Sequence, residues 1–345
     1  MLKSRFKFTA LFLVASNLLL TGCAEQTNSD EVNVYSSRKE ALIKPALDKF
    51  TAATGITVNL VTGKDDALIE RLKAEGSASP ADVLITVDAG RLYRAKSFGL
   101  TQAIDSKELS QNIPSSFRDP ENHWFGLSLR ARPIMYAKDR VNPAELNTYA
   151  SLTNEQWFGK VCIRSSGNIY NQSLVASMIA SIGVESVETW AKGMVNNFAR
   201  KPVGGDRDQI KAVAAGQCDV AVANTYYLFG MLQSGDPEQV TAAEKIGVFF
   251  PNQTDRGTHV NVSGIAVTQA AKNKAHAQQL LEFLSQNETQ SWYANVNGEY
   301  PVKEHIKPHP LLVAWGSFKK DALNLSKLGE LNSEAVKIMD RAGWP

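Results

Sequence analysis

Apolar and polar positions alternate along the chain in blocks that predict strands followed by amphipathic helices. The expected order in the first third is strand 32–35, helix 39–53, strand 56–61, helix 67–75, strand 81–86 and helix 90–98. The run at 81–86, Ala-Asp-Val-Leu-Ile-Thr, is nearly all apolar, which is typical of a strand buried on both faces of a mainly parallel sheet. This third therefore predicts an α/β unit.

The rest of the chain repeats this scheme. Strands are expected at 132–137, 160–164, 219–223, 246–250 and 257–267, and helices at 172–182, 187–197, 208–215, 274–284, 288–295 and 334–342. Pro133 favours a connecting strand, which together with residues 261–264 can form a pair that crosses between two lobes. We expect lobe 1 to contain residues 31–131 plus about 262–295, and lobe 2 residues 132–261 plus about 296–345. A hinged α/β protein of this kind binds its ligand in the cleft between the lobes.

The first residues have the pattern of an export signal. Lys3, Arg5 and Lys7 precede an apolar stretch at 8–20 that is too short to span a bilayer. Leu-Thr-Gly-Cys at 20–23 resembles a bacterial lipobox. We therefore expect a signal peptide at 1–22, a lipid on Cys23 and a tether at 23–30, and with them a periplasmic or cell-envelope location. The sequence leaves open which membrane would hold the lipid.

The charge balance of the chain argues against one class of partner, and its cysteines leave one structural question open. Three of the 37 basic residues lie in the signal, which leaves 34 against 35 acidic residues in the mature chain. Near neutrality argues against nucleic acid as a partner, because phosphate binding needs a concentrated basic surface. Cys162 and Cys218 both lie in apolar runs, so a disulfide and two buried free thiols are equally open.

Tyr226 and Tyr227 stand side by side directly after the strand at 219–223, and Asn224 or Thr225 is a favourable N-cap. The first turn of a helix favours negative charge, so phenolates form more readily there than in water. Ferric iron prefers hard anionic oxygen ligands and keeps its ligands deprotonated. The pair is therefore compatible with an iron site, although a Tyr-Tyr dipeptide taken alone more often consists of half-buried packing residues.

Several motifs in the expected order make the mature chain similar to the periplasmic ferric-iron-binding proteins that serve ABC importers. They are Tyr35-Ser36-Ser37-Arg38, Ser79-Pro80-Ala81-Asp82-Val83, Trp124-Phe125-Gly126, Arg130-Ala131-Arg132, Arg164-Ser165-Ser166 with Tyr170-Asn171-Gln172, Ala223-Asn224-Thr225-Tyr226-Tyr227, and Gly257-Thr258-His259-Val260-Asn261. The resemblance implies a type II periplasmic-binding-protein fold, α/β and two-lobed, with hinge strands. It also implies Fe3+ captured in the interlobe cleft and handed to a permease in the inner membrane.

The matching metal ligands are Tyr170, Tyr226 and Tyr227. The family's fuller coordination shells have His-Tyr after the Tyr-Ser-Ser-Arg segment, where this chain has Lys39-Glu40. Glu40 and Tyr35 are further candidate ligands, and a synergistic anion such as carbonate is another way to complete the shell. Arg130 is the expected partner of that anion, since its planar fork suits carbonate. The preference between Fe3+ and Fe2+ stays open.

Other functions have weaker support. The sequence contains no nucleophile elbow, P-loop or dinucleotide fingerprint, so we expect no enzyme. The main alternative is the same fold binding an oxyanion, a polyamine or an iron chelate. His305 and His309 are interrupted by Pro308 and are expected in a surface loop, while Asp88 is expected to cap the following helix. We expect a monomer.

Overall fold

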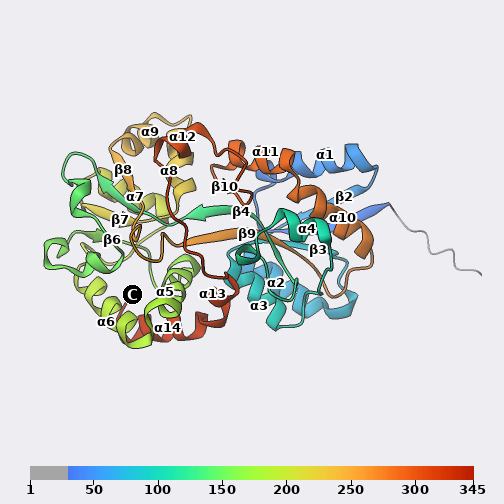
Figure 1. Cartoon of the computed structure of the whole chain (residues 1–345), viewed down its shortest axis with the longest axis horizontal. Helices are drawn as coiled ribbons and strands as arrows, with labels where there is room; N and C mark the ends of the chain where they lie inside the picture. The colour runs from blue at the N-terminus through green and yellow to red at the C-terminus, as the bar shows by residue number, and fades with distance from the viewer. Residues whose placement is uncertain (1–29) are drawn as a thin grey trace, which may run out of the picture.

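The computed structural model describes residues 30–345, which form two α/β lobes side by side (Figure 1). The predicted signal peptide, Cys23 and most of the tether lie outside the described residues. Within 30–345, no helix has the length and apolar character needed to cross a bilayer.

The first lobe is built on a six-stranded sheet in the order β10-β4-β9-β3-β1-β2. Its strands are β1 (Glu31–Ser36), β2 (Thr57–Thr62), β3 (Val83–Val87), β4 (Phe125–Ala131), β9 (Val260–Val267) and β10 (Tyr300–Pro301). The first three strands pair in parallel, and β9 runs antiparallel between β3 and β4. The helices packed on this lobe are α1 (Lys44–Thr54), α2 (Asp65–Glu75), α3 (Ala89–Ser97), α4 (Lys107–Asn112), α10 (Lys274–Ser285) and α11 (Asn287–Asn297).

The second lobe has a four-stranded sheet in the order β6-β7-β5-β8. These strands are β5 (Ile134–Ala137), β6 (Val161–Cys162), β7 (Val220–Val222) and β8 (Ile246–Phe249). Its helices are α5 (Ile169–Ile182), α6 (Val184–Asn196), α7 (Asp206–Ala214), α8 (Thr225–Leu232), α9 (Pro237–Glu244) and α14 (Asn332–Arg341). The short helices α12 (Pro310–Ala314) and α13 (Ser326–Glu330) lie in the segment that returns from β10 to α14. A disulfide joins Cys162 to Cys218 with 5.9 Å between the Cα atoms, which decides the question the sequence left open.

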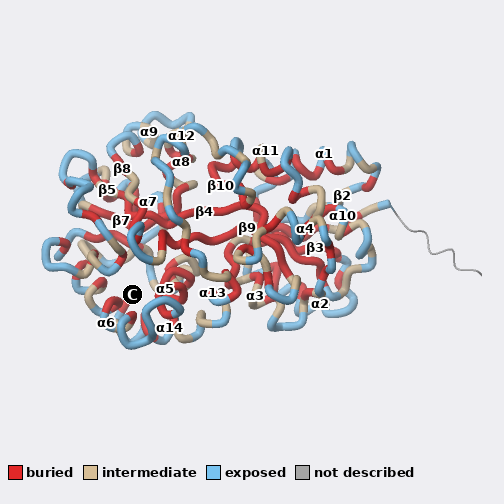
Figure 2. Tube along the Cα trace, viewed as in Figure 1, coloured by how far each residue is buried: buried red, intermediate tan, exposed pale blue. Residues whose placement is uncertain are grey.

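Two strands connect the lobes. Chain segments β4 and β9 are buried along their whole length and pair as far as Arg130 with Asn261 and Ala131 with Val260. Beyond β4, the backbone N–H of Arg132 donates to the carbonyl of His259 at 3.1 Å, and Pro133 leads into β5. Figure 2 shows the buried residues running from one sheet to the other along these strands. The predicted crossing pair is therefore present.

Element boundaries differ from the sequence expectation at two informative places. The expected helix at 39–53 is divided into a 3-10 turn at Glu40–Leu42 and α1, because Pro45 is suited to the first turn of a new helix. The residues from about 296 were assigned to lobe 2, but Tyr300–Pro301 pair with β4 in the first sheet. That short edge strand has no local hydrophobic pattern that identifies its partner.

Candidate metal site

Three tyrosines gather at the first turns of two helices in the second lobe. Tyr170 is the second residue of α5, and Tyr226 and Tyr227 are the second and third residues of α8. Helix α8 follows β7 almost directly, so its first turn lies at the carboxyl end of a strand. The Tyr226 hydroxyl donates to the Tyr170 hydroxyl at 3.2 Å, and the rings of Tyr226 and Tyr227 are 4.2 Å apart. The structure thus brings together the three tyrosines expected from the sequence.

Burial keeps two of these phenols neutral in the absence of a cation. Desolvation is the main reason that the pKa of Tyr170 and the pKa of Tyr226 lie well above the ordinary tyrosine value. The positive charge of Arg130 lowers both pKa values; Tyr170 and Tyr227 raise the pKa of Tyr226 further, whereas the hydrogen bond from Tyr226 lowers the pKa of Tyr170. A site of this kind ionises when a strongly charged metal replaces the protons.

Arg130 faces the tyrosines from the first lobe. Its guanidinium carbon is 5.6 Å from the centre of the Tyr170 ring and 6.0 Å from that of Tyr226. The side chain is buried, donates to the carbonyl of Val262, and lies 3.9 Å from Glu299. Its Nε is buried without a hydrogen-bond partner among the described residues. A cation with an unused donor therefore lies beside the phenols, as anion binding requires.

A second arginine supports the same region and was not predicted as a site residue. Arg38 donates from Nη1 to Ser263 at 2.5 Å and to Glu299 at 3.2 Å, so Glu299 faces both Arg38 and Arg130. Ser128 also donates to Glu299. The motif at 35–38 contains Arg38, but nothing local to Glu299 indicates that it faces residues more than one hundred positions away.

The two further candidate ligands are placed differently. The hydroxyl of Tyr35 donates to Glu75 at 3.0 Å, and its ring lies in a cluster with Leu68, Ile69 and Leu84. The Tyr35 hydroxyl is therefore bonded to the end of α2, and Tyr35 does not lie with the three tyrosines. Glu40 begins the 3-10 turn and is exposed.

The histidines and the aspartate that the sequence singled out lie where they were expected. Within the described residues, no group of three or more His, Cys, Asp or Glu side chains is arranged to hold a metal. His305 is exposed in a turn, and His309 precedes α12, where it caps the helix by accepting from the backbone N–H of Leu311 at 3.1 Å, so both histidines lie in the expected non-helical segment. Asp88 caps α3 as predicted, through the backbone N–H of Gly90 at 2.8 Å.

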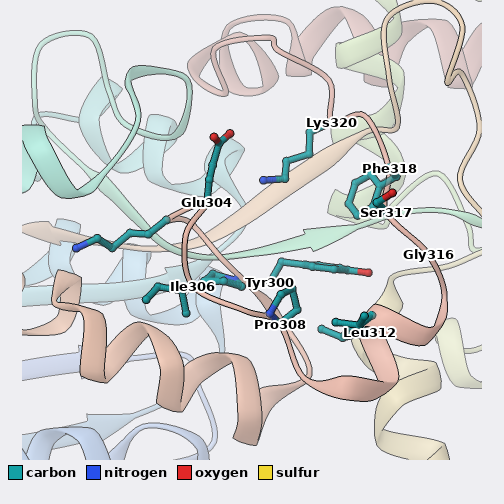
Figure 3. Close-up of a pocket in the computed structure, with 12 residues that line it drawn as sticks. Tyr300, Glu304, Ile306, Pro308, Leu312, Gly316, Ser317, Phe318 and Lys320 are labelled. Carbon is teal, nitrogen blue, oxygen red and sulfur yellow. The ribbon is translucent and has the colours of Figure 1, made fainter.

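A separate pocket of about 250 Å³ lies beside β10 and α12 (Figure 3). Its walls include Tyr300, Leu312 and Phe318, with Lys320 and Glu304 at its polar side. It contains none of the three tyrosines and no cluster of anionic oxygen donors, so it does not suit a trivalent metal.

Two α/β lobes, paired crossing strands and three convergent tyrosine side chains beside them are the features of a type II periplasmic binding protein. Residues 46–320 match the family described as bacterial extracellular solute-binding protein, and the chain belongs to this family. It is 47% identical to iron uptake protein A1 of Synechocystis, covering 97% of this chain and 96% of that protein.

Solved structures agree with this assignment. The Trichodesmium protein IdiA (FutA), in complex with iron and citrate ligands, is 51% identical, with a TM-score of 0.90 over 91% of this chain and all of that one. The ferric binding protein of Campylobacter jejuni is 39% identical, with a TM-score of 0.86 over 91% of this chain and 100% of that one. The resemblance to ferric-iron-binding proteins and the predicted fold class are thereby confirmed.

Proposed function

We propose that this protein captures ferric iron through the phenolates of Tyr170, Tyr226 and Tyr227 and delivers it to an ABC-type importer. The observation that carries the proposal is the convergence of the three phenols, with Tyr170 and Tyr226 3.2 Å apart at helix N-termini. Hard anionic oxygen is the donor type that Fe3+ prefers, and the macrodipole favours negative charge there. Relatives named for iron uptake and ferric binding support the same cargo.

A synergistic anion, carbonate being the simplest, is proposed to complete the coordination shell. Three phenolates neutralise one Fe3+, and Arg130 can offset the charge of an added anion. Its unpartnered Nε supports this role, as do the buried Nδ2 of Asn224 and hydroxyl of Thr225, which have no partner within residues 30–345. Glu40 is retained as an alternative donor from the first lobe. Tyr35 is omitted, because its hydroxyl is engaged by Glu75.

The proposed location is the periplasm or cell envelope. Membership in the extracellular solute-binding family supports export, and the lipobox-like segment supports a lipid on Cys23. The proposed partner is the permease of an inner-membrane ABC importer, which receives iron from a monomeric binding protein.

The test is an absorption spectrum of the soluble domain from residue 24 onward, loaded with ferric citrate in bicarbonate and then desalted. We expect a visible phenolate-to-iron band that is absent from the Tyr226→Phe/Tyr227→Phe variant. A colourless wild-type protein would exclude tyrosine ligation. In that case, the thermal unfolding of the protein would be measured with an added oxyanion or polyamine, and a raised unfolding temperature would identify the ligand.

A further inference from the structure

A buried ion pair lies behind the tyrosines and joins the starts of their two helices. Arg132, at the crossing between the lobes, donates from Nη1 to Asp206 Oδ2 and to Asn224 Oδ1, each at 3.0 Å. Its Nη2 donates to Asn171 Oδ1 at 2.6 Å. Arg132 is 1% exposed and Asp206 is fully buried, so these contacts are shielded from water.

The same pair also fixes the backbone on which the tyrosines are carried. Asp206 Oδ2 accepts from the backbone N–H of Asn224 at 2.8 Å, immediately before α8. Asn171, which follows Tyr170, donates from Nδ2 to the carbonyls of Arg164 at 2.7 Å and Ser165 at 3.1 Å. Each contact therefore acts within a few residues of a proposed metal ligand.

The shape of the arginine side chain matters here. A guanidinium presents several donors in a rigid plane, so one side chain can bond acceptors in different directions. Arg132 uses this geometry to reach Asn171 on α5, Asp206 at the start of α7 and Asn224 ahead of α8. A lysine amine is a compact charge on a flexible stem and does not reproduce that plane.

We propose that Arg132 and Asp206 form one positioning unit that sets the spacing of the Tyr170 and Tyr226 hydroxyls for the metal. The inference rests on the proposed function and extends it to residues that do not touch the cargo. Partners that orient metal ligands typically change affinity by about 10–100-fold when they are replaced. The backbone N–H of Arg132 donates to the carbonyl of His259, directly before the crossing strand β9, so the unit is anchored at the hinge.

The experiment compares wild type, Arg132→Lys, Asp206→Asn and the control Arg140→Lys. Arg140 lies in the same lobe and pairs with Asp219 at 3.2 Å, but Asp219 precedes β7 whereas Tyr226 follows it, so this pair lies at the opposite end of that strand, and Arg140 is partly exposed. For each protein we would measure Fe3+ affinity by citrate competition, the wavelength of the iron band, and the thermal unfolding of the iron-free form. We expect about 10–100-fold weaker binding and a shifted band in the first two variants, and neither change in the control.

A merely structural role would lower the unfolding temperature and leave the affinity and band of the folded protein unchanged, and that result would overturn the inference. If Arg132→Lys and Asp206→Asn do not fold, Asn224→Ser tests the same contact, because serine still suits the N-cap but loses the amide acceptor for Arg132. Wild-type affinity and band position in that variant would also overturn it. A wild-type protein that binds no iron would instead refute the proposed function, so the two failures are distinguishable.

Discussion

The hydroxyl of Tyr226 lies 3.2 Å from the hydroxyl of Tyr170, although 56 residues separate them in the chain. The two residues come from the first turns of different helices, so their contact exists only when α5 and α8 are packed in the second lobe. We expect Tyr170→Phe to weaken Fe3+ binding more than about 100-fold and to reduce the visible band, since it removes a ligand rather than a partner of one. Equilibrium competition with citrate measures this.

Tyr35→Phe is the matched control for that substitution. Because the Tyr35 hydroxyl is bonded to Glu75, its removal should lower stability by about 1–2 kcal/mol and leave the band unchanged. If Tyr35→Phe lost the visible iron band and Tyr170→Phe kept it, the ligand assignment would be refuted.

Iron binding should release protons. Since burial raises the pKa of Tyr170 and that of Tyr226, both phenols hold their protons at neutral pH, and Fe3+ must displace them. We therefore expect about two or more protons released per iron, and an affinity that falls as the pH falls. Calorimetry in buffers of different ionisation enthalpy measures the number, and a value of zero would contradict phenolate ligation.

Arg130→Gln should make iron binding independent of bicarbonate. The substitution removes a cation that faces both Tyr170 and Tyr226, while Glu299 keeps Arg38 as its partner. We expect weaker binding in bicarbonate and little further loss when bicarbonate is removed. Arg71→Gln is the control, because Arg71 packs over Tyr35 and not over the three tyrosines of the site. If bicarbonate increased the iron affinity of wild type and of Arg130→Gln by the same factor, residues other than Arg130 would bind the anion.

The hydroxyl of Ser173 donates to Asp88 at 2.9 Å, which links α5 of the second lobe to the start of α3 in the first. Ser173→Ala removes this cross-lobe hydrogen bond, which contributes about 1–3 kcal/mol. We expect iron release to a chelator to become about tenfold faster with no change in the band. The control Ser177→Ala removes a hydroxyl of α5 that donates to Leu174 and accepts from Arg256 within the second lobe, and a similar acceleration there would show that the cross-lobe contact is not the cause.

Loss of the disulfide should destabilise the protein without removing its iron site. The bond closes a loop across a sequence separation of 56 residues and joins β6 to the segment before β7. We expect Cys162→Ala/Cys218→Ala to lose about 2–4 kcal/mol of unfolding free energy, chiefly through a less restricted unfolded chain. Urea unfolding with and without reductant measures this. An unchanged midpoint would show that the bond contributes little.

The order of strands and helices was readable from the sequence because hydrophobic periodicity is a local property. The buried strand at 81–86, the crossing strand after Pro133 and the start of α8 at Thr225 all follow from neighbouring residues. The tyrosine pair, placed directly after a strand, also indicated the chemistry of the site.

Contacts between distant segments were decided by the tertiary structure. Side chains of β1 point alternately to the two faces of the sheet, and the sequence does not tell which face meets the cleft. In the fold, the side chain of Tyr35 points toward Glu75. Glu299 pairs with Arg38, and Asp206 pairs with Arg132, so the roles of both carboxylates depend on residues of distant segments. The pairing of β10 with β4 likewise joins segments that are far apart in the chain. Sequence by itself determined which residue types were available and in which local structure, whereas packing of the two lobes decided which of them meet, because such contacts depend on the three-dimensional arrangement of segments far apart in the chain.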